Sequence, residues 1–377
     1  MLKYIQNKLL SIQTIFLIEG SDILKVKFTL HINMIIIVLF VLSSCKIYRN
    51  AQLPNYTGIR GYYGDNPDTL RKVAEENYES LARYEEESKF YDSQSPVWGL
   101  AMSGGGVRSA IYNFGALKAL YDMHLLDSID IISSVSGGAY MSYWLYSDYY
   151  NNLESNSRFG YSLFNDNIFL QKVCLQQNKA NHFPSTKMIK LILTPPNSAF
   201  KSYENGIIRS FGHDQARPLY INDFIRYLSS DKAPYFIINA TISTKRKSEW
   251  PPKIYEFTPL GYGNSDIGYH NLINNDIHLS EVVAISGAAV KRKLAQDVDN
   301  YSEKIPNKKL TLSDGGHSEN LAAIALIKRG VNNIIIIDAE HNKNYSFDGY
   351  KILKNKLRNE LNLDLKISEI DKYLNGN

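Results

Sequence analysis

Three short segments of the sequence combine residue types that could cleave an ester bond. They read SGGGVRS at residues 103–109, SSVSGG at residues 133–138 and DGGHSEN at residues 314–320. The first offers backbone amides without side chains, the second a serine among small residues, and the third a carboxylate beside two glycines. A serine that attacks an ester needs donors for the developing oxyanion, an accessible hydroxyl and a base for its proton. Together the segments predict serine-based acyl chemistry without an obvious histidine base.

Ser136 is the predicted nucleophile. It lies between an apolar run and a predicted helix, and its neighbours depart from the common G-x-S-x-G turn only at Ser134. Serine is small enough to keep that turn tight, and a helix N-terminus favours the negative charge that develops during attack. Taken alone, the pentapeptide is more typical of a serine that caps a helix, so the prediction depends on the other two segments.

The glycine run at residues 104–106 is the predicted oxyanion loop. Without Cβ atoms, its backbone can approach a substrate closely and direct several N–H groups at one oxygen. Of two phosphate-binding alternatives, the P-loop fails on spacing and the dinucleotide fingerprint is weak. A P-loop needs Lys and then Ser or Thr after its last glycine, where Val107 and Arg108 stand, and a dinucleotide fingerprint needs a third glycine where Ser109 stands.

Asp314 is the predicted base. It follows an apolar run and precedes a predicted helix, as Ser136 does, although a carboxylate beside two glycines is also common in plain turns. His317 offers an alternative, in which the imidazole is the base and Asp314 orients it. We favour Asp314 as the base and expect His317 to be an orienting or structural residue.

The hydrophobic pattern predicts the elements that position these groups. Strands are predicted at residues 97–102, 129–135, 235–244, 310–313 and 333–337, and helices at residues 68–89, 107–123, 137–146 and 320–329. The alternation of strand and helix from residue 97 indicates an α/β fold with a parallel sheet. Catalytic groups are then expected at the carboxyl ends of the strands, where the glycine run and Ser136 fall.

Composition argues against several other classes of protein. The chain of 377 residues has a net charge of +4 and no long basic run, so nucleic-acid binding has little support. A hydrophobic content of 44% and a charged content of 21% are ordinary for a globular protein. The two cysteines, Cys45 and Cys174, are too few for a disulfide framework or a multi-cysteine zinc site.

Residues 1–45 are typical of a secretory signal followed by a lipidation site. The apolar stretch at residues 34–42 is too short to span a bilayer as a helix, follows Lys25 and Lys27, and leads into Leu-Ser-Ser-Cys ending at Cys45. This ending resembles the bacterial lipobox, which implies cleavage before Cys45 and acylation of its thiol. The alternative is a buried strand that ends in cysteine. Some 24 residues precede Lys25, so we expect the true start codon downstream of Met1.

The remaining chain divides into a tether and a catalytic domain. Residues 46–96 are predicted to form a polar tether and the helix at residues 68–89, in which Glu85–Glu87 are expected to face solvent. Residues 97–377 are the predicted domain. Within it, residues 149–231 have broken periodicity and a proline pair at 195–196 that is expected to stop a helix. We interpret this segment as an insertion, either a lid over the site or peripheral helices packed on the sheet.

The order of the motifs resembles the patatin-like phospholipases, and more closely their cytosolic phospholipase branch in its bacterial form. The resemblance begins near residue 97, reaches the C-terminus and includes SGAAV at residues 286–290, DGGHSENL at 314–321 and IIIIDAE at 334–340. It implies a three-layer fold with a central, mostly parallel sheet flanked by helices. It implies that the site consists of a Ser136–Asp314 dyad, an oxyanion hole from Gly104, Gly105 and Gly106, and Arg108 orienting an anionic head group, or else held in a structural ion pair.

The resulting prediction is a membrane-anchored serine acyl hydrolase of the bacterial cell envelope. It is expected to cleave lipid esters, with phospholipids as the expected substrates, through an acyl-enzyme and without a metal or cofactor. Membrane lipids are the expected partners, as substrate and as anchor, and no protein partner can be inferred. Two alternatives remain: an acyltransferase that uses the same acyl-enzyme, and a catalytically silent lipid-binding lipoprotein. A purely structural lipoprotein fits the loop glycines least.

Overall fold

A sheet of nine strands organises the part of the chain that the structure describes. The computed structural model describes residues 78–91, 97–151, 164, 171, 195–212, 218–228, 233–243, 253–272, 277–289, 294–299 and 309–376. These residues lie within one unit of the chain, Gly58–Asn377. The predicted signal at residues 1–45 with Cys45, most of the predicted tether, and Cys174 lie outside the described residues.

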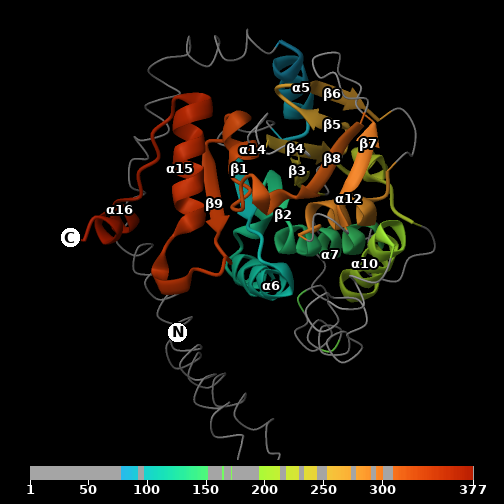
Figure 1. Ribbon diagram of the computed structural model, residues 1–377, viewed down its shortest axis with the longest axis horizontal. Coiled ribbons are helices and arrows are strands. Elements are labelled where there is room, and N and C mark those ends of the chain that lie inside the picture. Colours follow the sequence, from blue (N-terminus) through green and yellow to red (C-terminus); the bar gives the residue numbers. More distant parts are fainter. Residues whose placement is uncertain are drawn as a thin grey trace, which may run out of the picture. The chain divides into compact units, whose positions relative to one another are not determined.

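The centre of the sheet is parallel. β1 (Trp98–Met102), β2 (Ile131–Val135), β3 (Tyr235–Ile242) and β9 (Asn333–Ile337) lie in the order β3-β2-β1-β9 with parallel pairing throughout (Figure 1). The strands that extend this centre are antiparallel: β4 (Lys253–Thr258), β5 (Gly261–Asn264), β6 (Gly268–Asn271), β7 (Gln296–Asp299) and β8 (Lys309–Asp314). This arrangement confirms the predicted α/β fold.

The helices have the following bounds: α5 (Tyr78–Ser88), α6 (Gly106–Asp122), α7 (Gly137–Asn151), α10 (Pro196–Phe211), α11 (Ile225–Leu228), α12 (Leu279–Ser286), α14 (Ile324–Lys328), α15 (Asp348–Leu361) and α16 (Ser368–Leu374). Short 3-10 turns are η1 (Leu126–Ser128), η2 (Ile221–Phe224), η3 (Gly315–His317) and η4 (Lys343–Tyr345). The five predicted strands agree to within a few residues with β1, β2, β3, β8 and β9. The helices predicted at residues 107–123 and 137–146 agree similarly with α6 and α7.

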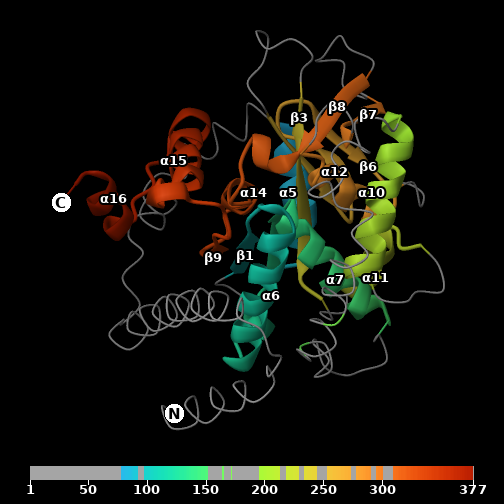
Figure 2. The same ribbon diagram turned by 60° about the horizontal axis from the view of Figure 1, so that its bottom comes forward.

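Helices cover both faces of the central strands. Gly99 of β1 faces α14, where an added Cβ atom would meet Leu326 at 3.0 Å. Ile131 of β2 pairs with Gly99, so its side chain lies on the same face of the sheet. Ser134 lies three positions further along β2 and therefore faces the opposite side, where its hydroxyl accepts a hydrogen bond from Ser142 of α7. Every residue of β2 and β3 is buried, as expected for strands covered on both faces. Figure 2 shows α6 beside α7.

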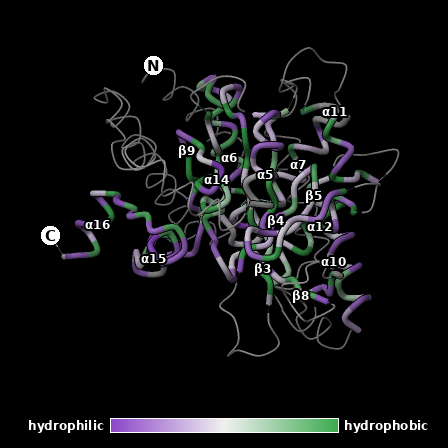
Figure 3. The backbone as a smooth tube through the Cα atoms, turned by 90° about the horizontal axis from the view of Figure 1, so that it is seen from above, coloured by the Kyte–Doolittle hydropathy of each residue, from purple (hydrophilic) through white to green (hydrophobic). Residues whose placement is uncertain are grey.

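Helix α10 lies within the segment at residues 149–231. The proline pair begins this helix, so the prediction that it stops one is wrong. Proline suits the first turn because its φ angle is already helical. It also lacks the N–H group that would have no partner in this turn. Hydrophobic and hydrophilic residues alternate along α10 (Figure 3), and its buried side chains, including Phe200, Tyr203 and Ile207, face α12 and α7. Most of the remaining segment lies outside the described residues, so the lid stays a prediction.

The helix predicted at residues 320–329 is shorter than expected, since α14 begins only at Ile324. Ala322 has a φ of 59°, in the left-handed region that interrupts a right-handed helix. The carboxylate of Glu319 accepts the N–H of Ala323 at 2.8 Å and that of Ile324 at 3.3 Å. This side chain therefore occupies the place of a helical turn and starts the helix.

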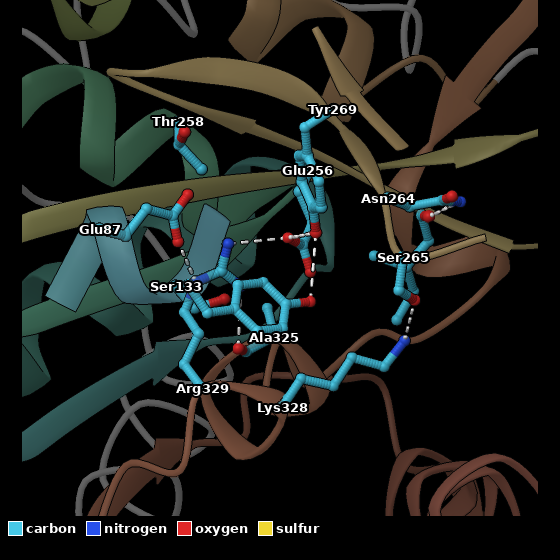
Figure 4. A network of polar contacts seen from close by, with 12 residues as sticks. Glu87, Ser133, Glu256, Thr258, Asn264, Ser265, Tyr269, Ala325, Lys328 and Arg329 are labelled. Atoms are coloured by element: carbon cyan, nitrogen blue, oxygen red, sulfur yellow. Dashed lines mark hydrogen bonds and ion pairs between the residues drawn. The ribbon is translucent and has the colours of Figure 1, made fainter. Parts of the chain in front are cut away.

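A buried charge cluster joins α5 to the sheet. Nε of Arg329 donates to Glu87 at 2.6 Å, and a terminal nitrogen of Arg329 donates to Glu256 at 2.9 Å (Figure 4). All three side chains are at most 3% exposed. The prediction that residues 85–87 face solvent is therefore wrong for Glu87, whose buried charge is offset by Arg329.

Candidate active site

Strands β2 and β8 bring two distant segments of the chain together. β2 runs parallel to β3 and ends where Val135 pairs with Asn239. β8 runs antiparallel along the same edge of β3 and ends where Asp314 pairs with Ala240. Because Asn239 and Ala240 are consecutive residues, the end of β8 meets the residue that follows β2. This topology places Asp314 against Ser136.

The hydroxyl of Ser136 donates directly to Oδ2 of Asp314 at 2.9 Å, across 178 positions of sequence. The other carboxylate oxygen accepts the N–H of Gly316 at 2.8 Å, which fixes the orientation of the carboxylate. Ser136 is 5% exposed and Asp314 is 7% exposed, so both border a cavity with little contact to bulk water. The pair can therefore transfer the serine proton to the carboxylate in one step.

Ser136 lies in a strained turn between β2 and α7. Its φ of 51° is in the left-handed region, which residues other than glycine rarely adopt. The two residues that follow must be glycine, because a Cβ atom on Gly137 would lie 2.1 Å from the carbonyl oxygen of Gly106. A Cβ atom on Gly138 would lie 2.2 Å from the carbonyl oxygen of Met102. Such a turn exposes a nucleophile at the top of a sheet.

Ser134 stands where the common turn has its first glycine. It belongs to β2, and its hydroxyl accepts a hydrogen bond from Ser142 of α7 at 2.8 Å. The side chain thus packs under the helix rather than in the turn itself. This is the physical reason why the turn accommodates serine at that position.

Ser286, the last residue of α12, supports the turn from the side. Its hydroxyl accepts the backbone N–H of Ser136 at 2.9 Å and donates to the carbonyl oxygen of Asn239 at 2.6 Å. Ser286 is fully buried. The hydroxyl thus bridges the nucleophile and β3, and holds Ser136 in its strained conformation. No hydrogen-bonding role of this serine was predicted from the sequence.

The glycine run forms a loop beside Ser136, with different roles for its three members. The N–H of Gly104 donates to the carbonyl oxygen of Asn320 at 2.9 Å. This bond corrects the expectation that all three amides serve an oxyanion, because the first one holds the loop to the DGGHSEN segment. Gly105 and Gly106 begin α6 and have φ values of 138° and 68°. N–H groups at a helix start have no intrahelical acceptor, so these two amides are the ones suited to an oxyanion.

His317 lies at the edge of the site rather than within the dyad. Nδ1 of His317 is 3.3 Å from the hydroxyl of Ser313, and the side chain is exposed. The hydroxyl of Ser136 reaches Asp314 without an intervening ring. The geometry therefore favours the carboxylate over the imidazole as the base.

Two tyrosines form part of the wall beside the dyad. The hydroxyl of Tyr203 donates to the carbonyl oxygen of Gly287 at 2.7 Å and also contacts the hydroxyl of Tyr140. Since Tyr203 has one proton and gives it to Gly287, Tyr140 is the donor in the contact between the phenols. Burial raises the pKa of Tyr140, and the charge of Asp314 adds to the rise, so this phenol stays protonated at neutral pH.

A cavity of about 650 Å³ opens at this end of the sheet. The dyad, the two tyrosines and the start of α6 line it, together with Glu340 and the first turns of α15. Arg108 also lines it, and its guanidinium contacts Nδ1 of His341 at 3.2 Å on the exposed side. A cavity of this size, with a cation near its mouth, can admit an ester with an anionic group.

Two further findings concern the described residues alone. They contain no group of three or more His, Cys, Asp or Glu side chains arranged to hold a metal ion. None of their helices combines the length and hydrophobicity that crossing a membrane requires.

The family model for patatin-like phospholipases matches residues 100–327 of this chain. The chain belongs to the patatin-like phospholipase family. The match spans the glycine loop, Ser136 and Asp314, and this enzyme family hydrolyses the acyl esters of lipids. Among curated proteins, no relative matches the chain.

Solved structures that the chain resembles come from humans and bacteria. Human GIVD cytosolic phospholipase A2 is 13% identical with a TM-score of 0.49, over 81% of this chain and 54% of that one. VipD from Legionella pneumophila is 15% identical with a TM-score of 0.29, over 59% and 46% of the two chains. ExoU from Pseudomonas aeruginosa, in its complex with SpcU, is 17% identical with a TM-score of 0.26, over 52% and 37%. This patatin-like chain thus spans about half the length of the solved structures that it matches.

The structure brings most of the predicted site residues of this patatin-like domain into one place. Ser136, Asp314, Arg108 and two of the three loop glycines line the same cavity. Their catalytic roles stay predictions. Sequence reasoning missed Asn320, whose carbonyl oxygen accepts the Gly104 N–H and whose amide donates to Glu340. Its position inside the DGGHSEN segment was the available signal. It also missed Ser286 and the tyrosine pair, because only the fold brings them to the site.

Proposed function

We propose that this domain is a serine acyl hydrolase that cleaves the carboxylic esters of lipids through a Ser136–Asp314 dyad. The direct hydrogen bond of 2.9 Å between the serine hydroxyl and the carboxylate is the observation that carries the proposal. Membership of the patatin-like phospholipase family supports lipid esters as the substrate class.

In the first half of the reaction, Oγ of Ser136 attacks the ester carbonyl while its proton passes to Oδ2 of Asp314. The carbonyl electrons move onto the oxygen, where the amides of Gly105 and Gly106 donate hydrogen bonds. The bond from carbon to the alcohol oxygen then breaks. The alcohol oxygen takes from Asp314 the proton that came from Ser136, and the acyl group stays on Oγ of Ser136.

In the second half, a water molecule attacks the acyl carbon and gives its proton to Asp314. The bond to Oγ of Ser136 breaks, and the serine takes that proton as the fatty acid leaves. Each loop donor of this kind is worth roughly 3 kcal/mol of barrier in a serine protease. The fixed carboxylate, held by Gly316, supports the same residue as base in both halves.

Phospholipids are the substrates that we propose within this class. Arg108 lines the mouth of the cavity, and a guanidinium presents planar donors that match a phosphate. The contact between Arg108 and His341 involves an imidazole rather than a carboxylate, which supports a positive group available to an anion. A phosphate bound there would position the ester carbonyl deeper in the cavity.

We also propose that Cys45 carries a lipid anchor that keeps the enzyme on a membrane of the cell envelope. The support is the sequence at residues 34–45 alone. Each buried CH₂ of an acyl chain contributes about 0.8 kcal/mol, so several chains give stable anchoring. A Cys45→Ala variant would then leave the membrane fraction and lose its acyl mass. Unchanged membrane association and no acyl mass on the unaltered chain would refute the anchor.

The test of the function is a product analysis. The purified full chain is incubated with phosphatidylcholine vesicles and with a short soluble ester, each with and without a long-chain alcohol. Free fatty acid as the product in all conditions is expected, with Ser136→Ala inactive. Acyl transfer to the alcohol in preference to water would favour the acyltransferase alternative. No turnover of either substrate by the folded chain would favour the silent lipid-binding alternative.

A further inference from the structure

An aromatic patch, defined as Tyr345, Phe347 and Tyr373, lies at the N-terminal end of α15 and on α16. The rings of Tyr345 and Tyr373 are 6.4 Å apart between centroids, and those of Phe347 and Tyr373 are 5.6 Å apart. Although Tyr373 comes from α16, it therefore forms one surface with the loop that leads into α15.

The patch is unusually open to solvent for aromatic side chains. Tyr345 is 64% exposed and Tyr373 is 53% exposed, and Ile352 of α15 is 43% exposed nearby in the chain. These three account for half of the exposed large hydrophobic residues within the described part of the chain. Exposed apolar groups that gather at one place mark surfaces that meet a partner.

Strained backbone presents the patch. Asn344, Tyr345 and Phe347 have φ values of 59°, 54° and 49°, all in the left-handed region. Three such residues within four positions are rare in a chain of L-amino acids without glycine. Strain of this kind persists where the surrounding structure enforces it, and it gathers at functional surfaces. The loop from β9 to α15 thus holds the side chain of Tyr345 in solvent.

The loop that carries Tyr345 and Phe347 leads directly into one wall of the active-site cavity. Asp348, Gly349 and Ile352 line the same cavity as Ser136. Asp348 directly follows Phe347, and Ile352 lies one helical turn further along α15. The first turns of α15 therefore form one rim of the cavity, and the residue that precedes this rim in the chain belongs to the aromatic patch.

Two lysines of α15 near the patch are paired with aspartates. Lys351 lies 3.8 Å from Asp348, and Lys354 lies 2.7 Å from Asp371. A surface that combines these paired lysines with tyrosine rings matches a zwitterionic lipid interface better than a strongly anionic one. Tyrosine suits that boundary because its ring is apolar and its hydroxyl remains in water.

We propose that Tyr345, Phe347 and Tyr373 dock the domain on a zwitterionic phospholipid bilayer, with the cavity mouth facing the lipid. The proposal rests on the proposed function, since it assigns the orientation in which the same site meets its substrate. Lipid then enters along the first turns of α15 without crossing bulk water.

The test uses an environment-sensitive fluorophore on the full chain. The background carries Ser136→Ala, so that vesicles are not consumed, together with Cys45→Ser and Cys174→Ser. A single cysteine is introduced as Tyr345→Cys or Tyr373→Cys and labelled with a nitrobenzoxadiazole dye. Met123→Cys is the matched control, because Met123 is 47% exposed but lies at the C-terminal end of the 17-residue helix α6. That helix is about 25 Å long, so the control lies far from the cavity end.

Addition of phosphatidylcholine vesicles is expected to raise the dye emission at positions 345 and 373 several-fold. Spin-labelled lipids with a shallow nitroxide are expected to quench it, while position 123 responds to neither. Equal responses at all three positions, or none at positions 345 and 373, would overturn the proposal. A concentration-dependent rise without vesicles would also overturn it, because the patch would then meet a second copy of the chain.

A second measurement separates this proposal from the proposed function. In the chain with an intact Ser136, Tyr345→Ser combined with Tyr373→Ser should lower the ratio of vesicle to soluble-ester turnover by about tenfold, which corresponds to the partial burial of two rings. Met123→Ser should leave that ratio unchanged. An unchanged ratio in the double variant would overturn the docking proposal. If the unaltered chain cleaves neither substrate, the proposed function fails, whereas the fluorescence result still supports or overturns docking.

Discussion

Ser136 meets Asp314 because β2 and β8 run toward each other along one edge of β3 and end at its consecutive residues Asn239 and Ala240. The hydroxyl and the carboxylate then need no third group between them, and they lie 2.9 Å apart. A parallel strand and an antiparallel strand that share an edge thus bring together the two residues of the proposed dyad.

Replacement of Asp314 by Asn tests the base. The amide has the same shape but cannot accept the serine proton, so kcat on a soluble ester should fall by about 10²–10⁴. His317→Ala is the control, and we expect less than a several-fold effect, because this ring does not lie between the dyad residues. A larger fall of kcat in His317→Ala than in Asp314→Asn would instead assign the base to His317.

Replacement of Ser286 by Ala tests the support of the strained turn. The change leaves the N–H of Ser136 and the carbonyl of Asn239 without their partner, at a cost of about 1–3 kcal/mol for a buried unpaired group. We expect kcat to fall while KM changes little, because Ser286 holds the nucleophile and does not touch the substrate. Ser280→Ala, on the same helix and bonded to Glu204, is the matched control. Equal losses in both variants would indicate a general effect on α12.

Replacement of Arg329 by Met tests the buried charge cluster. It leaves Glu87 and Glu256 buried without their cation, so the free energy of unfolding should fall by about 3–5 kcal/mol. Arg358→Met removes an exposed pair with Asp364 and should change stability little. Chemical denaturation measures both. Similar small effects in the two variants would mean that water reaches the cluster.

Replacement of Glu340 by Gln tests a pH dependence of stability. Burial raises the pKa of Glu340, against the lowering effect of its bond from Asn320. A carboxyl with a raised pKa stabilises the fold fully below its unfolded pKa, and this contribution is lost as the pH rises through the folded pKa. The variant lacks this titration. Its stability relative to the unaltered chain should therefore rise as the pH increases from about 4 through the folded pKa of Glu340. A constant or falling difference over that range would contradict the raised pKa.

The parallel centre of the fold could be predicted from the sequence because its signals are local. Strand β9 is an apolar run after Asn333, and α6 and α7 each begin at a glycine, so their bounds appear in the pattern. The antiparallel strands β4 to β7 were not predicted. They are only four to six residues long, and β5 and β6 contain glycine, which is uncommon in strands. The alternation of apolar and polar residues is therefore too brief to indicate a strand.

The residues of the candidate site also fall into those that local sequence indicates and those that only the packing of the fold brings to the site. Ser136 and Asp314 stand in recognisable turns, so their residue types and spacing indicated them. The roles of Ser286 and Tyr203 depend on how α12 and α10 pack, which no local pattern encodes. The burial of Glu87 likewise depends on Arg329, which lies 242 positions away.

The most direct test of the dyad is covalent labelling with a fluorophosphonate, followed by peptide mapping. The unaltered chain should gain one phosphonyl group on the peptide that contains Ser136, and Ser136→Ala should gain none. Asp314→Asn should label far more slowly, since the base is missing. A folded, unaltered chain that stays unlabelled, or a label on a different residue, would contradict the account and would leave the silent lipid-binding alternative.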